Sequence, residues 1–411
     1  MHSSTATTLD PFSAEVCHDP YPRYARLRAG DAAQFVEDLN LWVVSRHDDV
    51  RAALTDPDAF SNALTVFPSQ PVCPEALEIL GAIRSAPSIG ALDGDEHARR
   101  RRPLMATFPS SPRRVAAWGP RIRAIAGELV DELQPHGEAD LVRGYAWEFA
   151  VRVILDVLAV PRDAHDRIKR GSEGRVALVW GQTTDAEQVE IARDFAGFHE
   201  YCQELVAARV ADPGEDLLSA LIAYRADDGG RLSESELASL VVDLLSAGHE
   251  TTSNVIANGM LNVLASGVWA KLVADPTRIP VALEEILRYD TSTIGWLRYT
   301  TRPVMVGDVE IPARQRVLLL LGSANRDERR FADPDTFDIT RPDAAEHVSF
   351  SAGRHFCSGA AFARLEARVA LEVLAERLPG LRLREGFEPQ YVPSIALRKL
   401  KALPVTWDAE L

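Results

Sequence analysis

A single cysteine lies in a sequence context that could hold a metal ion. Cys357 closes a glycine-containing stretch that begins at Phe350, and a helical pattern over residues 360–378 follows it. A thiol near a helix N-terminus meets the positive end of the helix dipole and free backbone N–H groups, which lower its pKa and favour the metal-binding thiolate. Gly353 and Gly359 permit backbone torsions and close approaches that a side chain would block. A lone cysteine is more often a structural residue than a ligand, so its surroundings must decide.

The residues around Cys357 form a longer pattern. Phe350, Gly353, Cys357 and Gly359 follow the order Phe-x-x-Gly-x-x-x-Cys-x-Gly, with His355 two residues before the cysteine. This pattern resembles the haem-binding signature of the cytochrome P450 family, in which a cysteine thiolate is the axial ligand of haem iron and favours cleavage of the O–O bond. The resemblance implies haem b (iron protoporphyrin IX) as the cofactor and Cys357 as the metal ligand, with the other four residues as cofactor-binding residues.

Two further observations bear on this resemblance. Ser351 stands where the family more often has glycine, so the turn departs from the family pattern at that position. A zinc site is disfavoured, because His355 and Cys357 supply two ligands and no second pair follows at zinc spacing. Haem is therefore the better interpretation of the thiol.

An acid and an alcohol stand side by side in a long apolar helical pattern. Gly248 precedes Glu250 and Thr251, and it would open space for a small ligand such as O2. A charge is costly to bury and threonine is a poor helix former, so a kinked helix with solvated polar residues is the simpler interpretation of these residues alone. Residues 247–252 also resemble the P450 motif whose acid and alcohol deliver protons during oxygen activation. The resemblance implies that Glu250 relays protons and that Thr251 positions the oxygen.

His97 and Arg101 could bind a carboxylate group. They are four residues apart, which places them on one face of a helix. The run of arginines over residues 99–102 allows the alternative of a solvated basic face. The family pattern His-x-x-x-Arg matches this pair and implies that it binds the haem propionates, together with Arg298 and His355.

Glu285 and Arg288 resemble the family's Glu-x-x-Arg helix, which pairs with an arginine in a later loop, here Arg341. Residues at i and i+3 on a helix can form an ion pair, and a second arginine can bind the same carboxylate. A generic helix ion pair contributes little to stability. In this context we expect the trio to be a structural lock on the cysteine region rather than part of catalysis.

Composition limits the classes of function. The chain has 411 residues, 46% of them hydrophobic, and a formal net charge of −15, which disfavours nucleic acid as a partner. Four scattered cysteines indicate no disulfide framework and fit a reducing cytoplasm. The first 19 residues lack a basic region, an apolar run and a spanning helix, so we expect a cytoplasmic protein without a membrane anchor.

Helical periodicity dominates the pattern of predicted elements. Ser233 and Glu236 form a capping box that begins a long helix, apolar on several sides and therefore expected to be central. Residues 35–36 and 42–44 form one expected hairpin, and residues 304–306 and 309–311 form another. The sequence predicts a mainly α fold with a minor β part (α+β). The resemblance implies a single P450 domain over residues 1–411, with haem between the central helix and the helix after Cys357, and no fused reductase.

The family resemblance also implies partners. Without a fused reductase, electrons would come from a separate ferredoxin and ferredoxin reductase. Ferredoxins are usually acidic, so docking needs a basic patch, or the arginines are simply scattered over the surface. The candidate patch residues are Arg99, Arg100, Arg102, Arg113, Arg114 and Arg354. Positions carried over from the family predict a mainly aliphatic substrate pocket lined by Ile89, Val179, Leu244, Ala247, Ile294 and Ile395, which indicates an apolar small molecule.

The function most consistent with these features is a haem-thiolate monooxygenase. It would use O2, two electrons and two protons to hydroxylate or epoxidise an apolar small molecule in bacterial secondary metabolism or catabolism. Three alternatives remain open at this point: oxidative coupling or desaturation by the same chemistry, a haem-thiolate sensor without turnover, and an interaction protein without a cofactor. The filled Glu250–Thr251 pair counts against the sensor.

Overall fold

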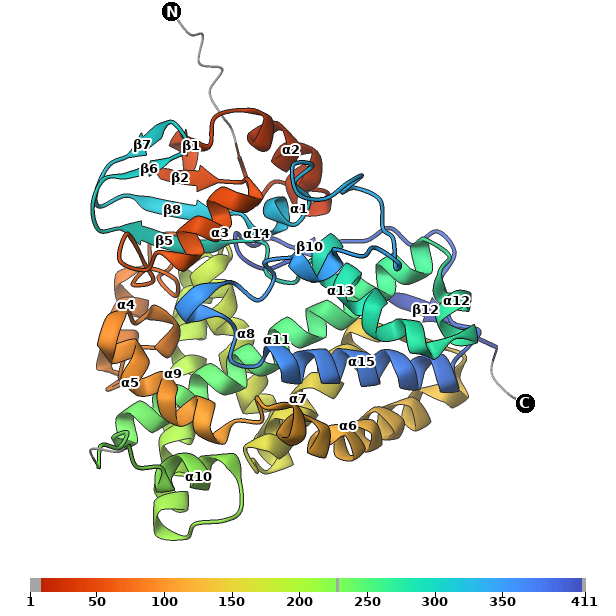
Figure 1. Cartoon of the computed structure of the whole chain (residues 1–411). Coiled ribbons are helices and arrows are strands. Elements are labelled where there is room, and N and C mark those ends of the chain that lie inside the picture. Colours follow the sequence, from red (N-terminus) through yellow and green to blue (C-terminus); the bar gives the residue numbers. More distant parts are fainter. Residues whose placement is uncertain (1–8, 227–228, 409–411) are drawn as a thin grey trace, which may run out of the picture.

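A sheet-rich corner and a larger helical body make up the molecule (Figure 1). The computed structural model describes residues 9–226 and 229–408; residues 1–8, 227–228 and 409–411 lie outside this description. The first 19 residues, which we expected to carry no membrane anchor, therefore lie partly outside the described residues. The mainly α fold with a minor β part is confirmed. Within the described residues, no helix has the length and apolar character needed to cross a membrane.

The principal sheet joins segments from both ends of the chain. Its strand order is β1-β2-β8-β5-β3, in which β2 and β8 are parallel and the other neighbours are antiparallel. Its strands are β1 (Ala33–Val36), β2 (Leu41–Val44), β3 (Phe60–Ser61), β5 (Trp296–Thr300) and β8 (Arg316–Leu319). The expected hairpins are confirmed by the β1–β2 pair and by the pair of β6 (Val304–Val306) with β7 (Val309–Ile311). Gly307 has a φ of +58° at the second turn, a conformation that glycine adopts without strain.

Short elements surround this sheet and connect it to the helical body. The helices beside the sheet are α1 (Ala14–His18), α2 (Tyr21–Ala29), α3 (His47–Thr55) and α14 (Leu321–Ala324). The remaining strands are β4 (Glu138–Asp140), β9 (Arg382–Leu383), β10 (Tyr391–Val392), β11 (Lys399–Leu400) and β12 (Pro404–Thr406). They form a β4-β12-β9 sheet and a β10-β11 pair.

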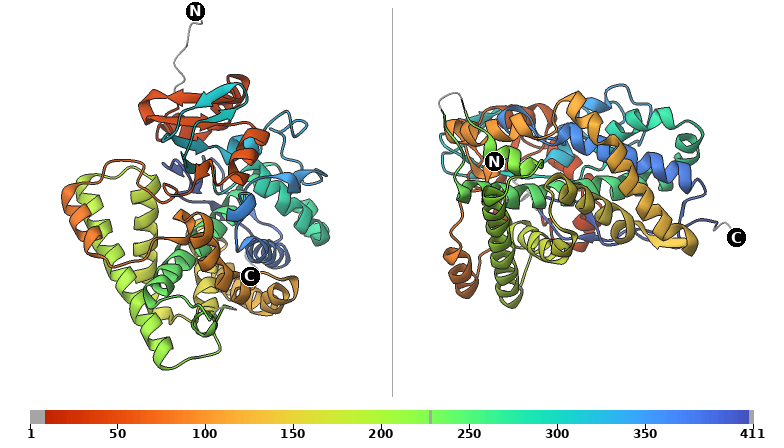
Figure 2. Two further views of the ribbon diagram at one scale, coloured as in Figure 1. Left: turned by 60° about the vertical axis from the view of Figure 1, so that its left-hand side comes forward. Right: turned by 90° about the horizontal axis from the view of Figure 1, so that it is seen from below.

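The helical body contains the long amphipathic segments of the chain. Its α-helices are α4 (Pro74–Ala82), α5 (Gly94–Thr107), α6 (Pro112–Leu133), α7 (Glu148–Val157), α8 (His165–Trp180), α9 (Asp185–Ala211), α10 (Leu217–Ala223), α11 (Glu234–Ala265), α12 (Trp269–Ala274), α13 (Ile279–Tyr289) and α15 (Ala360–Arg377). Shorter helical turns include η2 (Ile89–Ala91), the π-helix η4 (Val142–Trp147) and η8 (Gly353–His355). Figure 2 shows α8 and α9 on one side of the body with α4 against them.

Helix α11 runs through the centre of the body, as expected (Figure 1). Its first turn is fixed by the predicted capping box, because Ser233 Oγ accepts from the Glu236 N–H at 3.3 Å and Glu236 Oε2 accepts from the Ser233 N–H at 2.8 Å. Most of its side chains are buried, since α7, α9, η4 and α15 pack around it. Helix α15 in turn packs on α6 and α11, which places the residues before its N-terminus beside the central helix.

Candidate functional site

One face of α11 is open in the middle of the molecule. Ala247 is exposed and Leu244 and Thr251 are half-buried, although His249 and Glu250 between them are buried. Exposed surface along one face of a helix whose other faces are buried indicates a space beside it. The exposed positions are spaced at three and four residues, so they share a face. This face is therefore where α11 borders a binding site.

Gly248 serves close packing rather than ligand space. A Cβ added at Gly248 would lie 2.8 Å from Ile154 Cγ1, so a larger residue would force the Ile154 side chain of α7 to shift. The expectation that Gly248 opens room for O2 is therefore wrong. The room lies at Ala247 on the neighbouring face instead.

Thr251 lies at the end of the open face. Its hydroxyl donates to the Ala247 carbonyl oxygen at 2.9 Å, one helical turn back. The next residue, Thr252, is buried and is hydrogen-bonded to the buried Glu366 of α15. Burial raises the pKa of Glu366 well above its ordinary value despite this bond. The contact brings α11 and α15 together close to Thr251.

Glu250 points away from the open face. Its Oε2 accepts from Lys399 Nζ of β11 at 3.1 Å, and Lys399 also donates to Glu173 Oε1 of α8 at 3.3 Å. His249 Nε2 lies 3.5 Å from Glu250 Oε1 without a hydrogen bond between them. Burial raises the pKa of Glu250, but attraction from Lys399 and His249 outweighs it and lowers that pKa to about 2. In this arrangement Glu250 is an ion-paired carboxylate.

Residues 350–359, here called the Cys loop, fold back on themselves before α15. The Cys357 N–H donates to the Phe350 carbonyl at 2.9 Å, which closes the loop. Gly353 has a φ of +65°, and a Cβ there would lie 3.1 Å from both Leu54 O and Thr55 Cα. Only glycine therefore lets the loop pack against α3. Ser351, the position that departs from the family pattern, has a φ of +63°.

The Cys357 thiol faces a space inside the molecule. Cys357 retains exposed surface, yet burial among protein atoms raises the pKa of its thiol. The Gly359 N–H, Arg101 and Arg364 favour the thiolate but do not offset this burial. The expectation that the helix N-terminus lowers the pKa of the thiol is therefore wrong for the polypeptide alone. A bound cation would supply the stabilisation that the thiolate lacks.

Four basic side chains, here called the basic cluster, lie beside the Cys loop: His97, Arg101, Arg298 and His355. The His97 and His355 rings stack with centroids 4.0 Å apart, and Arg101 Nη2 donates to the Phe356 carbonyl at 2.5 Å. Burial and the neighbouring His97 and Arg298 lower the pKa of His355 to about 3. The cluster thus brings together the residues to which the family resemblance assigned propionate binding.

Arg298 is buried and forms no ion pair with another residue that the structure describes. Its side chain donates to Thr65 Oγ1 at 3.3 Å and to the Leu297 carbonyl at 2.9 Å, both neutral acceptors. Burial lowers the pKa of this guanidinium to about 10. Of the carboxylates, Asp93 comes nearest to the cluster, 3.9 Å from His355 Nε2, and it accepts hydrogen bonds from Ser61 and Asn62. A buried cation needs a counter-ion, so this donor set fits the carboxylates of haem.

Glu285, Arg288 and Arg341 meet in the interior. Arg288 binds both oxygens of Glu285, at 2.7 and 2.8 Å, and Arg341 Nε lies 3.3 Å from Glu285 Oε2. Arg288 also donates to the Asn325 carbonyl at 2.8 Å. The Asn325 side chain in turn donates to Ser349 Oγ at 2.8 Å, which connects the trio to the start of the Cys loop.

Comparisons with known proteins agree with this geometry. Residues 279–378 match the family model "Cytochrome P450". The chain is 37% identical to Cytochrome P450 107B1 of Saccharopolyspora erythraea over 98% of this chain and 99% of the relative. The chain belongs to the cytochrome P450 family. It is also 36% identical to 6-deoxyerythronolide B hydroxylase of the same organism, over 98% of this chain and 100% of that relative.

Solved P450 structures share the fold along the whole length. Cytochrome P450 CREJ, in complex with (4-ethylphenyl) dihydrogen phosphate, superimposes with a TM-score of 0.93 at 33% identity, covering 98% of this chain and 100% of that chain. The chain is therefore a P450 monooxygenase, an enzyme of a family that uses haem, O2 and electrons from redox partners.

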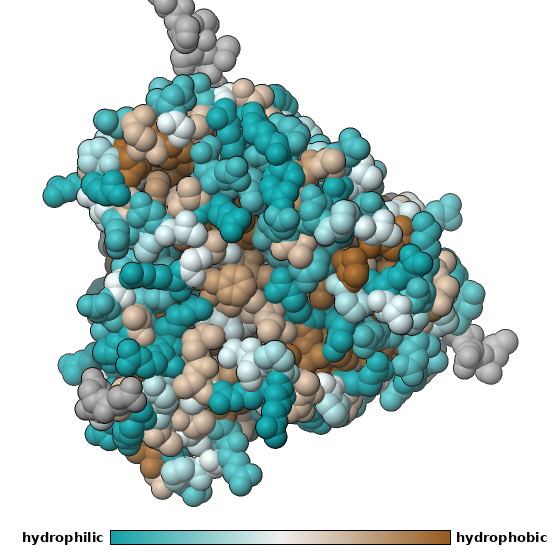
Figure 3. All heavy atoms as spheres, in the orientation of Figure 1, coloured by the Kyte–Doolittle hydropathy of each residue, from teal (hydrophilic) through white to brown (hydrophobic). Residues whose placement is uncertain are grey.

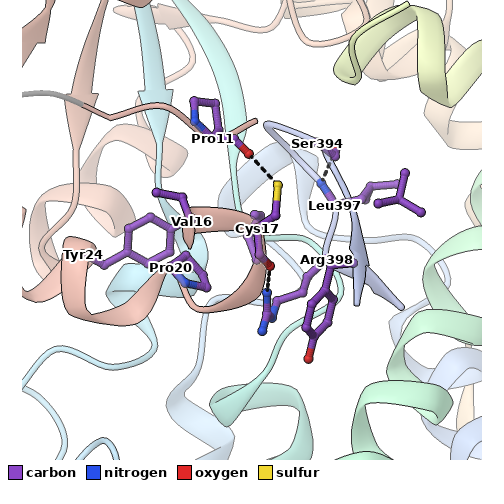
Figure 4. A pocket seen from close by; sticks show the side chains of 11 residues that line it. Pro11, Val16, Cys17, Pro20, Tyr24, Ser394, Leu397 and Arg398 are labelled. Carbon is purple, nitrogen blue, oxygen red and sulfur yellow. Dashed lines mark hydrogen bonds between the residues drawn. The ribbon is translucent and has the colours of Figure 1, made fainter. Parts of the chain in front are cut away.

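The predicted substrate residues of this P450 fall into two groups. Leu244 and Ala247 lie on the open face of α11, and Ile89 is half-buried in η2. Val179, Ile294 and Ile395 are buried among protein atoms. A separate small cavity, lined by residues that include Ile294, Cys17 and Arg398, lies between the N-terminal segment and β10 (Figure 4).

Three residues near the P450 site escaped the motif-based analysis: Lys399, Asp243 and Asp93. Lys399 partners Glu250 from a two-residue strand far along the chain, so nothing in the sequence indicates the pairing. Asp93 carries a weak signal, because an acid directly before the helix of His97 is a typical N-terminal residue. Asp243 is a lone acid inside an apolar helical pattern, and that alone could have singled it out.

Proposed function

We propose that this P450 binds haem b through the Cys357 thiolate and oxygenates an apolar small molecule. The observation that carries the assignment is Arg298, a buried guanidinium that forms no ion pair with a described residue and lies close to His355 of the Cys loop. Haem would supply the two carboxylates that the basic cluster lacks and the metal cation that the thiolate lacks.

Bound haem supplies the redox chemistry of oxygen activation. The protein binds it and controls its surroundings. Arg298, Arg101, His97 and His355 would hold the propionates, and the Phe350 ring would shield the thiolate from water. The Thr251 hydroxyl, now bonded to the Ala247 carbonyl, is free to rotate toward a ligand on the open face of α11. Glu250 can deliver a proton there only after it separates from Lys399.

The substrate is an apolar or weakly polar molecule. The open face presents Leu244 and Ala247, and Ile89 adds a further aliphatic side chain, with no cation among them to demand an acidic group. The relatives include a hydroxylase of 6-deoxyerythronolide B. We therefore place the enzyme in bacterial secondary metabolism or catabolism, as one domain in the cytoplasm that takes electrons from a ferredoxin and its reductase.

The thiolate assignment is tested by the spectrum of the reduced, carbon monoxide-bound protein. Purified haem-loaded protein should absorb at the wavelength after which the family is named, and Cys357→Ala should abolish that band. Cys202→Ala, which removes a buried thiol of α9, is the matched control and should retain it. A band that survives in Cys357→Ala would refute Cys357 as the ligand.

A further inference from the structure

The face of α11 that is open at Ala247 is covered one turn earlier. Ser239, Asp243, Ala247 and Thr251 follow each other at intervals of four residues and therefore lie along one side of the helix. The first two bind another segment: Ser239 Oγ donates to the Ala86 carbonyl at 2.9 Å, and Asp243 binds the residues that follow. The segment 86–89 thus ends where the open face begins.

Asp243 holds two separate elements with one carboxylate. Its Oδ2 accepts from Ser88 Oγ at 2.8 Å and from the Ile89 N–H at 2.9 Å. Its Oδ1 accepts from Arg175 Nη1 of α8 at 3.0 Å. All three bonds are to an ionised acceptor, which makes them stronger than bonds between neutral groups. The Asp243 side chain is only 13% exposed, so water competes weakly for its oxygens.

The segment 86–89 is held by polar contacts more than by apolar packing. Besides Ser239 and Asp243, Arg100 donates to the Pro87 carbonyl at 2.9 Å. Ile89 is only half-buried, and Pro87 is exposed. Loss of Asp243 would therefore remove the contacts that anchor Ser88 and Ile89, and it would free Arg175 of α8 at the same time.

We propose that Asp243 is a positioning residue that holds segment 86–89 in place beside the substrate pocket. Asp243 connects segment 86–89, α8 and α11 through one carboxylate and so keeps Ile89 beside the open face. A ligand could then enter the pocket only when these hydrogen bonds break together. The proposal rests on the proposed function, since that function makes the space beside Ala247 the substrate pocket.

Amide hydrogen exchange in the haem-loaded protein tests directly whether Asp243 holds segment 86–89. In Asp243→Asn, amide exchange in residues 85–92 should rise about tenfold or more, the scale expected when hydrogen bonds to a charged group are lost. Exchange in α15 should stay unchanged. Asp156→Asn is the matched control, because it breaks the 2.5 Å Arg121–Asp156 pair between α6 and α7 without touching the segment. A uniform rise over the whole chain, or no local rise, would overturn the proposal.

Ligand kinetics supply the second measurement. 4-Phenylimidazole, an apolar azole whose binding shifts the haem absorption, should bind and leave Asp243→Asn several-fold faster than the parent protein, with a smaller change in Kd. Ser88→Ala should show part of the effect, and Ser88→Thr should restore the parent rates. Unchanged rates despite faster exchange would show that Asp243 does not control entry. Failure of the parent protein to bind haem would refute the proposed function; exchange compared between the haem-free parent and haem-free Asp243→Asn would then still decide whether Asp243 holds the segment.

Discussion

Ser351 has two energetically unfavourable features that a glycine at this position would not have. Its φ of +63° is a left-handed conformation that costs a residue with a Cβ about 1 kcal/mol relative to glycine. Its hydroxyl is buried without a hydrogen-bond partner among the described residues, which is a second unfavourable feature. The departure from the family pattern at this position is thus a departure in side chain and not in backbone geometry.

Ser351→Gly should therefore stabilise the protein. We expect the free energy of unfolding to rise by about 1 kcal/mol, because glycine accepts the left-handed backbone and leaves no unsatisfied hydroxyl. Thermal melting of the haem-loaded protein measures the change. Ser351→Ala removes only the hydroxyl and is the control. Equal melting temperatures for the glycine and alanine variants would mean that the backbone conformation costs nothing.

Thr251→Ala should uncouple electron use from product formation. The variant loses the hydroxyl on the open face while the backbone of α11 keeps its other hydrogen bonds, so electron consumption should persist and product per electron should fall. Thr251→Ser keeps the hydroxyl and should retain most of the coupling. The measurement is the ratio of product to NADPH consumed with the redox partners and a turned-over substrate. A ratio unchanged in the alanine variant would exclude the role.

The Glu250–Lys399 pair should make stability depend on pH in a predictable direction. The folded-state pKa of Glu250, about 2, lies below its ordinary value of 4.5, so the pair stabilises the protein above pH 4.5 and this contribution is lost as the pH falls toward 2. In Lys399→Met, burial without the lysine raises the pKa of Glu250, so acidification should favour the folded variant. The difference in melting temperature between the two proteins should therefore shrink as the pH is lowered. Parallel curves would contradict the pairing; Lys271→Met, at an exposed lysine, is the control.

At the scale of elements, the buried trio fixes α13 to the loops that precede α15. Glu285 and Arg288 are both fully buried. Arg288 and Arg341 donate to backbone carbonyls of residues 325–336, and Glu285 accepts from the Asp338 N–H at 2.8 Å. The trio stabilises the fold only when all three charges are present, because removal of one charge leaves the others buried without compensation.

Glu285→Gln should destabilise the protein by about 3–5 kcal/mol, since it leaves two buried arginines facing a neutral amide. Glu132→Gln breaks an exposed ion pair with Arg152 and should cost about 0–1 kcal/mol. Melting of the two haem-loaded variants measures both costs. A small loss for Glu285→Gln would show that the trio is not a structural lock.

The sequence predicted elements whose signals are local. The capping box at Ser233 and the turn at Gly307 depend on neighbouring residues alone, and both appear as expected. Strand β3 is two residues long and pairs with β5, far along the chain, and β11 is also two residues long, so neither has a periodicity that could reveal it. The same limit applies to the site. Motif spacing predicted which residues gather near Cys357, whereas the orientation of Glu250 toward Lys399 depends on tertiary packing.

At the scale of the whole molecule, the chain has a net charge of −15, but docking of a redox partner depends on the charged side chains exposed near the Cys loop. The face shown in Figure 3 is mainly hydrophilic, with less polar residues near its centre, where the Cys loop lies. Two of the six arginines expected there are engaged internally: Arg99 and Arg100 pair with Glu96 and Glu236, and Arg100 is buried. They contribute little free positive charge, so the predicted patch is smaller than expected.

The remaining arginines are exposed and none of them forms an ion pair with another described residue: Arg102, Arg113, Arg114 and Arg354. Arg354 belongs to the Cys loop and adds to burial in lowering the pKa of His97 in α5, and Arg114 donates to the Ala106 carbonyl of the same helix. We expect this group to dock an acidic ferredoxin, because opposite charges accelerate association. Phe356 of the Cys loop is also exposed.

Charge reversal at Arg102 and Arg113 should slow reduction by an acidic ferredoxin. We expect the double variant Arg102→Glu, Arg113→Glu to be reduced roughly tenfold more slowly at low ionic strength, with the difference shrinking as salt screens the charges. Arg384→Glu, at an exposed arginine beside β9, makes the same type of charge change elsewhere and should have little effect. Stopped-flow reduction at several salt concentrations is the measurement. Arg100→Glu should instead destabilise the fold, because it places a buried carboxylate against Glu96 and Glu236. Equal reduction rates for the double variant and the parent protein would exclude this face as the docking site.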